Sequence, residues 1–206
     1  MIRSSKGRDR EATSKAIVEA AESVLAEGGF QAFGVNAIAR RANCDKQLIY
    51  RYFGGLEGLA DAIGADLAAR FADHLGHLSA TAPPATYGAM IEVLTLQLLD
   101  LLRADPVMQK IIAGELAGAS PLVDRMVEAR GRRLAAWMHE MRGDLAPPAH
   151  VDAPAVNAVL IAATQQLALS ASASGRFAGL PLRTDEDWRR VRETLVQLIR
   201  GVYGRP

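Results

Sequence analysis

The sequence predicts an all-helical protein. Half of its 206 residues are apolar but only 5% are aromatic, and alanine and leucine, which favour helices, dominate over the β-branched residues that favour strands. Apolar side chains recur at the three- and four-residue spacing of amphipathic helices, with glycine, proline and short polar residues between the repeats. A chain of this length can bury roughly 70% of its unfolded surface. We therefore expect about nine helices, no strands, and a core that forms without disulfides.

Three helices are predicted near the N-terminus, over residues 9–27, 35–42 and 46–53. Gly28 and Gly29 end the first helix because glycine accepts the backbone of a helix C-terminus. Gly34 can cap the second helix. Asp45 is the expected N-cap of the third, where its side chain accepts a backbone hydrogen bond and its charge meets the positive end of the helix dipole.

Six further helices follow, predicted over residues 56–78, 87–104, 106–116, 121–142, 153–174 and 186–203. Pro106 and Pro121 suit the first turn of a helix, where a missing backbone N–H costs nothing. Thr184, with Asp187 three residues later, resembles a capping box that opens the last helix. The chain shows no sequence repeat and no coiled-coil heptad run.

The stretch "IARRANCDKQLIYRYF", residues 38–53, predicts a helix-turn-helix. Two short helices are joined by only three residues, and Asn43 suits the sharp bend because asparagine tolerates the left-handed backbone conformation. Ala39 leaves room for the second helix to cross closely. The side chains expected to fill the space between the two helices are Ile38, Cys44, Ile49 and Phe53.

The opposite face of residues 46–53 is predicted to point outward. It carries hydrogen-bond donors with one apolar side chain among them: Lys46, Gln47, Leu48, Tyr50 and Arg51. Residues 1–53 also hold nine lysines and arginines against six acidic residues, a net charge of +3, whereas the rest of the chain carries −2. A donor-rich face on the positive part of a chain suits DNA.

Residues 12–63 resemble the DNA-binding domain of the TetR family of bacterial transcription regulators. The pairs that fall at the family's spacings are Gly29-Phe30, Ile38-Ala39, Ile49-Tyr50 and Tyr52-Phe53. The resemblance implies a DNA-binding domain over residues 1–55 and a ligand-binding and dimerisation domain over residues 56–206. It further implies a homodimer that binds a palindromic operator in double-stranded DNA and releases it when a small-molecule effector binds, without any cofactor.

The predicted contacts divide into base readers and backbone binders. Lys46 and Gln47, at the start of the third helix, are expected to meet base edges in the major groove, and Leu48 a thymine methyl group. Tyr50 and Tyr52 are expected to bind phosphates, although Tyr52 could equally be a core aromatic. Further contacts are expected from Asn36 on the second helix and from the basic side chains Arg40, Arg41 and Arg51. The basic segment 3–10 either enters the minor groove or is a mobile tail.

Four departures from the family pattern favour an alternative function. Gly34 stands where the family commonly has a phosphate-binding Thr or Ser, and Leu56 stands where it has a lysine. Asn43, Cys44 and Asp45 replace Gly-Val-Ser, and Leu48 replaces a Thr. Because these changes remove several contacts with the DNA backbone, the alternative is a helical small-molecule-binding dimer whose DNA binding is weakened or lost.

Several side chains in the second half are candidates for an effector site, which we expect to be mainly apolar. Methionine adapts to irregular shapes, and a buried polar group needs a partner that a ligand can supply. An ordinary core explains any one of the apolar residues as well as a pocket does. The candidates are Met90, Leu94, Gln97, Met108, Glu115, Met126, Trp137 and Gln165.

The last two helices are the predicted dimer interface. Residues 153–174 carry no charge, and their small side chains permit close approach of another helix. An apolar surface of this kind would be a liability if it were left exposed. The residues expected at the interface are Leu160, Thr164, Leu167, Trp188, Val191, Leu195 and Ile199.

The uncharged stretch 153–175 is long enough to span a bilayer. Its asparagine, glutamines and serines, and the absence of flanking basic clusters, instead predict a helix buried within the protein. The polar N-terminus does not resemble a signal peptide, so we expect a cytoplasmic protein. No nucleophile elbow, phosphate-binding loop, metal motif or paired carboxylates point to an enzyme.

Overall fold

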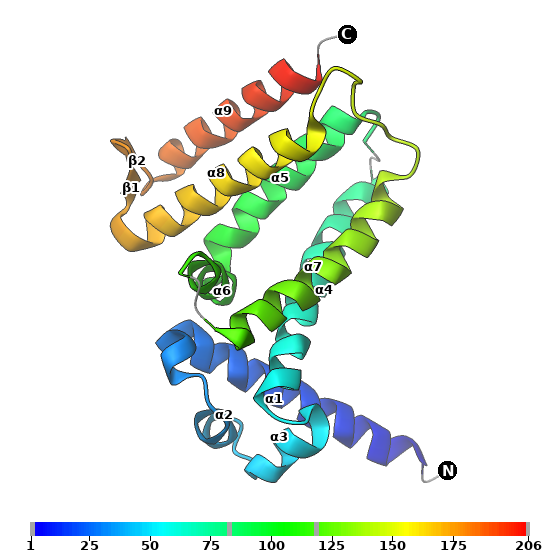
Figure 1. Ribbon diagram of the computed structural model, residues 1–206, viewed down its shortest axis with the longest axis vertical. Coiled ribbons are helices and arrows are strands. Elements are labelled where there is room, and N and C mark those ends of the chain that lie inside the picture. The colour runs from blue at the N-terminus through cyan, green and yellow to red at the C-terminus, as the bar shows by residue number, and fades with distance from the viewer. Residues whose placement is uncertain (1–2, 82–83, 118–119, 205–206) are drawn as a thin grey trace. The chain divides into compact units, whose positions relative to one another are not determined.

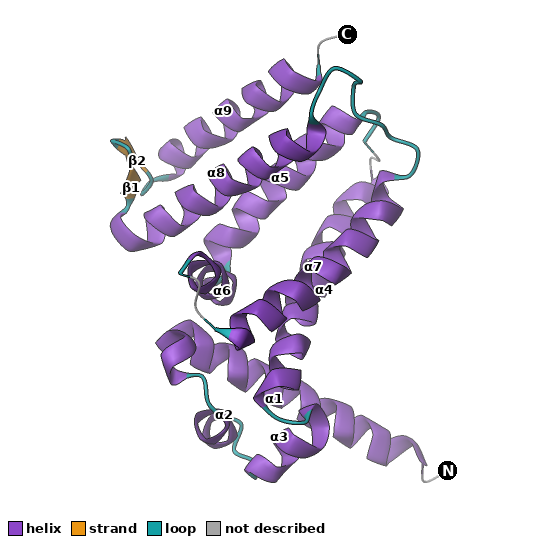
Figure 2. Ribbon diagram, in the orientation of Figure 1, coloured by secondary structure: helices purple, strands orange, loops and turns teal. Residues whose placement is uncertain are grey.

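The computed structural model describes residues 3–81, 84–117 and 120–204 (Figure 1). Nine helices and one short hairpin make up this described part of the chain (Figure 2). In chain order they are α1 (Arg3–Ala32), α2 (Val35–Arg41), α3 (Lys46–Phe53), α4 (Leu56–Thr81), α5 (Tyr87–Ala104), α6 (Pro106–Leu116), α7 (Pro121–Arg142), α8 (Ala153–Ser174), β1 (Arg176–Phe177), β2 (Leu180–Pro181) and α9 (Asp185–Tyr203). The all-helical fold class is confirmed.

Local signals fix most of the helix ends at the predicted residues. The Asp45 carboxylate accepts a hydrogen bond from the Gln47 backbone N–H, as an N-cap does. The Thr184 hydroxyl accepts from the Asp187 N–H while the Asp187 carboxylate accepts from the Thr184 N–H, which completes the predicted capping box. α1 differs, because it begins at Arg3 rather than at residue 9. Its predicted stop is visible as a break at Gly29, whose φ of 63° and ψ of −164° are not helical.

The expectation of no strands was wrong. Between α8 and α9, β1 and β2 pair antiparallel, with Phe177 opposite Leu180. Ala178 and Gly179, the two residues between the strands, both have positive φ, 47° and 84°, which suits a two-residue hairpin loop. Strands of two residues are too short to show the alternation of polar and apolar side chains by which a strand is recognised in a sequence.

The chain divides into two compact units that are not consecutive in sequence. Unit 1 comprises Met1–Arg70 and Pro106–Leu134, and unit 2 comprises Phe71–Asp105 and Ala135–Pro206. α4 and α7 therefore each contribute residues to both units. The functional boundary predicted at residue 55 falls inside unit 1.

Unit 1 packs α6 and the first part of α7 with the N-terminal helices. Gly114 of α6 lies so close to α1 that an added Cβ would come within 2.7 Å of the Phe30 ring. Gly64 of α4 similarly lies against the backbone of Met126 on α7. Arg125 of α7 pairs with Asp61 of α4 at 2.8 Å. Glycine at these two close approaches lets helix backbones meet where a larger residue would force them apart.

Unit 2 is built on α5, which packs against both α8 and α9 (Figure 1). Each of the three helices buries one face in this core. At one end, Asn157 of α8 donates to the Tyr87 hydroxyl and accepts from the Tyr203 hydroxyl, at 2.9 and 2.8 Å. These bonds satisfy the polar atoms of the cluster and join α5, α8 and α9.

α8 is not buried in the way that its composition led us to expect. Only 17% of its most apolar 18-residue window is buried, and Val159 on its outer face is 67% exposed. By length and composition it is the one described helix that could cross a bilayer. Its inner face nevertheless packs on α5 as part of a helical core, and serine and glutamine lie along its length. The exposed outer face of α8 was not predicted because no charged residue marks it in the sequence.

Candidate nucleic-acid interface

The turn between α2 and α3 has the geometry that the sequence predicted. Asn43 adopts a φ of 49°, in the left-handed region. The Cys44 N–H donates to the Ala39 carbonyl at 3.0 Å, so the turn folds back on the end of α2. α3 then runs from Lys46 to Phe53 and is capped by Gly54, which has a φ of 75°. The helix is thus held at both ends within unit 1.

Isoleucines on the two helices hold α3 against α2. Ile38 and Ile49 are fully buried, whereas Cys44 and Phe53 are only partly buried. Burial, and then the charge of Asp45, raise the pKa of the Cys44 thiol. A raised pKa lowers the fraction of reactive thiolate, in keeping with the expectation that Cys44 is a packing residue.

The outward face of α3 presents the predicted side chains to solvent. Lys46, Gln47 and Arg51 are exposed, and Tyr50 is 55% exposed despite its large ring. Leu48 is half-buried. An exposed face of donors on a short helix that is fixed from behind has the shape and chemistry needed to enter the major groove of DNA.

Tyr52 is neither a fully buried core aromatic nor a free surface residue. Its side chain is half-buried, and the Arg10 guanidinium lies over its ring, 5.6 Å from the ring centre. Sequence analysis missed this contact because it joins the start of α1 to the end of α3, and no local pattern indicates such a long-range pair.

The basic residues of α2 have different surroundings. Asn36 and Arg40 are exposed, as expected of residues that meet DNA. Arg41, by contrast, pairs with both carboxylate oxygens of Glu27 and donates to the Ser23 hydroxyl. The Arg41 guanidinium lowers the pKa of Glu27 through this hydrogen-bonded pair. Arg41 thus joins α2 to α1 through Glu27 and Ser23; its contact with the DNA backbone stays a prediction.

Residues 17–63 match the family model for bacterial regulatory proteins of the tetR family. This match covers the helix-turn-helix and the helices on either side of it. The N-terminal part of the chain therefore carries a tetR-family DNA-binding domain. No curated protein matches the sequence.

Solved structures similar to this chain include regulators from several bacteria. The fatty acid degradation regulator FadR from Bacillus halodurans is 17% identical, with a TM-score of 0.68 over 92% of this chain and 95% of that one. FadR from Bacillus subtilis, solved with stearoyl-CoA, is 15% identical, with a TM-score of 0.68 over 93% and 99%. Salmonella enterica GusR is 19% identical, with a TM-score of 0.64 over 94% and 96%. At these identities the likeness shows that the whole fold is shared.

The predicted effector-binding residues are divided between the two compact units. Met108, Glu115 and Met126 belong to unit 1, and the other five, Met90, Leu94, Gln97, Trp137 and Gln165, belong to unit 2. Met90, Leu94, Met108 and Met126 are buried, and the Trp137 ring meets Phe71 edge-on. Glu115 is exposed and pairs with Arg130 at 3.0 Å. Arg130 balances the charge of Glu115, which weakens the case for a polar ligand contact there, and the contact stays a prediction.

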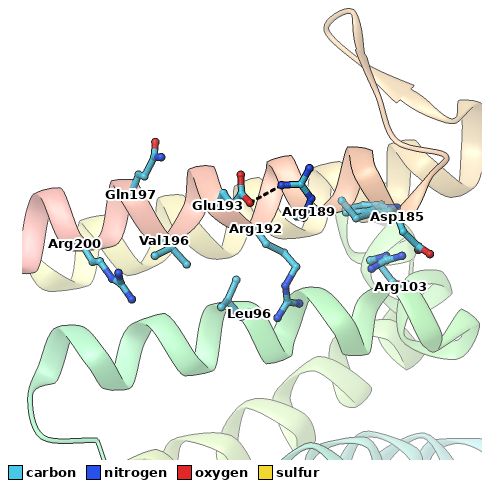
Figure 3. Close-up of a pocket in the computed structure, with 10 residues that line it drawn as sticks. Leu96, Arg103, Asp185, Arg189, Arg192, Glu193, Val196, Gln197 and Arg200 are labelled. Atoms are coloured by element: carbon cyan, nitrogen blue, oxygen red, sulfur yellow. Dashed lines mark hydrogen bonds and ion pairs between the residues drawn. The ribbon is translucent and has the colours of Figure 1, made fainter.

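A groove of about 490 Å³ in unit 2 is lined by none of the eight predicted effector-binding residues. It follows the seam between α5 and α9, as Figure 3 shows. Ion pairs cross this seam: Arg192 pairs with Asp100 at 2.6 Å and Arg200 with Glu92 at 2.7 Å. The Arg103 guanidinium carbon lies over the Trp188 ring, 4.4 Å from the ring centre. These contacts engage three of the arginines that line the groove and join α5 to α9.

The residues predicted for the dimer interface face the interior of a single chain. Leu160, Thr164, Trp188, Val191, Leu195 and Ile199 are all buried within a single chain, and Leu167 is partly buried. Their helices use these faces to pack on α5, and the Thr164 hydroxyl donates to the Leu160 and Ile161 carbonyls of its own helix. Side chains that one subunit already covers cannot also form the contact with a second subunit.

Proposed function

We propose that this protein is a transcriptional repressor of the TetR family that binds a palindromic operator as a homodimer and is released by a small, mainly apolar effector. The observation that carries the proposal is the outward face of α3. Lys46, Gln47, Tyr50 and Arg51 are exposed there, while the fully buried Ile49 fixes the helix from behind. A recognition helix needs both properties, because its side chains must be free and its axis must be rigid.

The residues of this face divide the work of binding. Gln47 and Lys46, in the first turn of α3, reach base edges, where glutamine can pair with adenine and lysine with guanine. Tyr50 and Arg51 bind phosphates and set the orientation of the helix, as do Arg40 and Asn36 from α2. Leu48, being half-buried, has a smaller area available for a thymine methyl group.

The dimer is proposed to form through the outward faces of α8 and α9. Val159 is 67% and Leu198 is 56% exposed on these faces, and α8 carries no charged side chain. Pairing two copies through such a surface would remove apolar area from water. A twofold axis between the copies would also place the two α3 helices on successive half-sites, which is why we propose a palindromic operator.

The effector is proposed to be mainly apolar because the helices of the second half offer methionine, leucine and tryptophan side chains and few charges in their interior. FadR of Bacillus subtilis was solved with stearoyl-CoA, so a fatty acyl chain is a sensible first ligand to test. Ligand and operator would oppose each other by linkage, since the ligand-bound dimer would hold the two α3 helices at a spacing that does not fit DNA.

The alternative function is that of a ligand-binding dimer with weakened DNA binding. Gly34 provides no side-chain cap at the start of α2, and so it offers no hydroxyl to a phosphate there. Leu56 similarly has no charge for the DNA backbone. The free donors that remain on α3 favour DNA binding over this alternative.

Selection of purified protein against random duplex DNA, followed by binding measurements at increasing KCl, separates the two functions. A repressor should enrich a palindromic sequence, and log Kd should rise with log[KCl] by about 0.9 for each phosphate contact. Adding stearoyl-CoA or a free fatty acid should weaken binding if either is the effector. Failure to enrich any duplex, by a protein that is folded and dimeric, would favour the ligand-binding dimer instead.

A further inference from the structure

Arg10 differs from three other arginines of unit 1 in the partner of its guanidinium. Arg41, Arg70 and Arg125 each pair with a carboxylate, on Glu27, Glu22 and Asp61 respectively. Within the described part of the chain no acidic side chain pairs with Arg10, which is exposed and stacks on the Tyr52 ring. Its positive charge is therefore available to an outside partner.

The stacking also constrains Tyr52. A guanidinium over the ring face, 5.6 Å from its centre, is attracted by the negative face of the aromatic ring. The phenol hydroxyl lies in the plane of the ring and stays free to donate, and no described residue hydrogen-bonds to it. The pair thus combines a fixed hydroxyl donor with a neighbouring positive charge.

The location of the pair indicates what it meets. Tyr52 lies in the last turn of α3, two residues beyond the exposed Tyr50 and next to the exposed Arg51. Arg10 reaches it from α1, which continues as a helix to Arg3. A hydroxyl and a guanidinium side by side are the donors that bind one phosphate group, since both can donate to its oxygens.

We propose that Arg10 and Tyr52 form a joint phosphate-binding site at the end of α3, in which Arg10 binds the DNA backbone and also positions the Tyr52 ring. The proposal rests on the proposed DNA-binding function and adds α1 to the interface. It gives Arg10 a role different from both expectations for residues 3–10, a minor-groove arm and a mobile tail.

The test uses the full-length protein and the duplex that wild-type protein selects from random DNA. Arg10→Gln removes the charge and the stacking cation, and we expect it to weaken binding about tenfold, the loss of one hydrogen bond to a charged group. The slope of log Kd against log[KCl] should fall by about 0.9 per subunit. Arg10→Lys keeps the charge and should restore most of the slope.

A matched control removes another positive charge from the same helix. Lys15 lies on α1 and pairs with the exposed Glu19 at 3.7 Å. Lys15→Gln should change neither the slope nor the affinity by more than about twofold, because exposed paired charges contribute little. Circular dichroism of each variant establishes that α1 remains helical.

Coupling between the two residues is measured by a double-mutant cycle with Tyr52→Leu, which removes the ring. If Arg10 positions Tyr52, the double variant should bind no more weakly than the worse of the two single variants. Fully additive losses would overturn the joint site.

Two further outcomes are distinguishable. In the first, wild-type protein binds DNA more weakly as the salt concentration rises, and Arg10→Gln changes neither the affinity nor the slope of log Kd against log[KCl]. That result would overturn this inference and leave the proposed function intact. Wild-type protein that binds no duplex at any salt concentration would overturn the proposed function and the joint site with it.

Discussion

Gln47 and Tyr50 share the outward face of α3, yet they are expected to act on different parts of DNA. Gln47→Ala should change base preference, because a glutamine that pairs with adenine contributes about 1–3 kcal/mol of discrimination. Tyr50→Phe should weaken binding to every sequence by a similar factor, since a lost phosphate contact carries no sequence information. Competition between the selected operator and its single-base variants measures both effects. Equal losses on all sequences from both substitutions would refute this division of labour.

Tyr203 is expected to lower the free energy of unfolding at alkaline pH. Burial raises the pKa of Tyr203 to about 12, with the nearby Tyr87 and Asp152 adding to the shift. A raised pKa means that the folded state favours the neutral phenol, so its contribution is fully present below pH ~10 and is lost as pH rises towards 12. We expect the free energy of unfolding to fall by up to about 2 kcal/mol over this window.

The control for that titration is Tyr203→Phe, which removes the ionisable hydroxyl and its bond to Asn157. The difference in unfolding free energy between wild type and Tyr203→Phe, measured by urea denaturation, should shrink between pH 9 and pH 12. A difference that stays constant would show that Tyr203 does not titrate in this range.

At the level of single residues, local chemistry could be predicted and long-range pairing could not. Asn43, Asp45 and the exposed side chains of α3 follow from helix spacing and turn preferences within a few residues. The contacts of Arg41 and Arg10 could not be predicted, because their partners, Glu27 and Tyr52, lie on other helices. A basic residue on a predicted outward face can bind DNA or a neighbouring helix, and only the fold decides which.

Among the secondary-structure elements, those with strong end signals were predicted within a residue or two. An Asp, Thr, Gly or Pro residue that caps the helix or suits its first turn marks one end of each of these helices: α3, α5, α6, α7 and α8. The start of α1 has no such signal, and its polar composition is equally compatible with a coil. The hairpin between α8 and α9 depends on two residues of positive φ, and alanine at the first of these is uncommon.

The turn of the helix-turn-helix offers a test at this scale. Asn43 has a φ of 49°, a conformation that costs a β-branched residue about 1–2 kcal/mol. Asn43→Val should lower the free energy of unfolding by that amount, whereas Asn43→Gly should leave it nearly unchanged because glycine adopts positive φ freely. Urea denaturation measures both variants. A loss for Asn43→Gly as large as that for Asn43→Val would mean that the asparagine side chain, and not its backbone, holds the turn.

For the molecule as a whole, an apolar stripe shows that one face of a helix is covered but not what covers it. The stripe of α9, with Trp188, Val191, Leu195 and Ile199, was assigned to a second subunit, and α5 of the same chain covers it instead. The same limit applies to the effector site, because methionines suit a core and a pocket equally. Spacing in a sequence carries no information on which surface meets which.

The proposed dimer surface on the outer faces of α8 and α9 can be tested by one substitution. Val159 is 67% exposed on the outer face of α8, so Val159→Arg should leave the fold of one subunit intact while it places a charge at the proposed dimer surface. Burying that charge without a partner would cost several kcal/mol, and two copies would bring both arginines to the twofold contact. Light scattering during size-exclusion chromatography should then give the mass of one subunit, where wild-type protein gives two.

The matched control is Val93→Arg, since Val93 is also an exposed apolar residue of unit 2, at 41%, but lies on α5. This variant should remain dimeric and bind the operator as wild type does. Val159→Arg should lose operator affinity steeply, because a single α3 reads only half of a palindrome and two separate subunits no longer share one binding event. A Val159→Arg protein that keeps the dimeric mass would place the subunit contact elsewhere, and monomeric wild-type protein would exclude the two-site mechanism altogether.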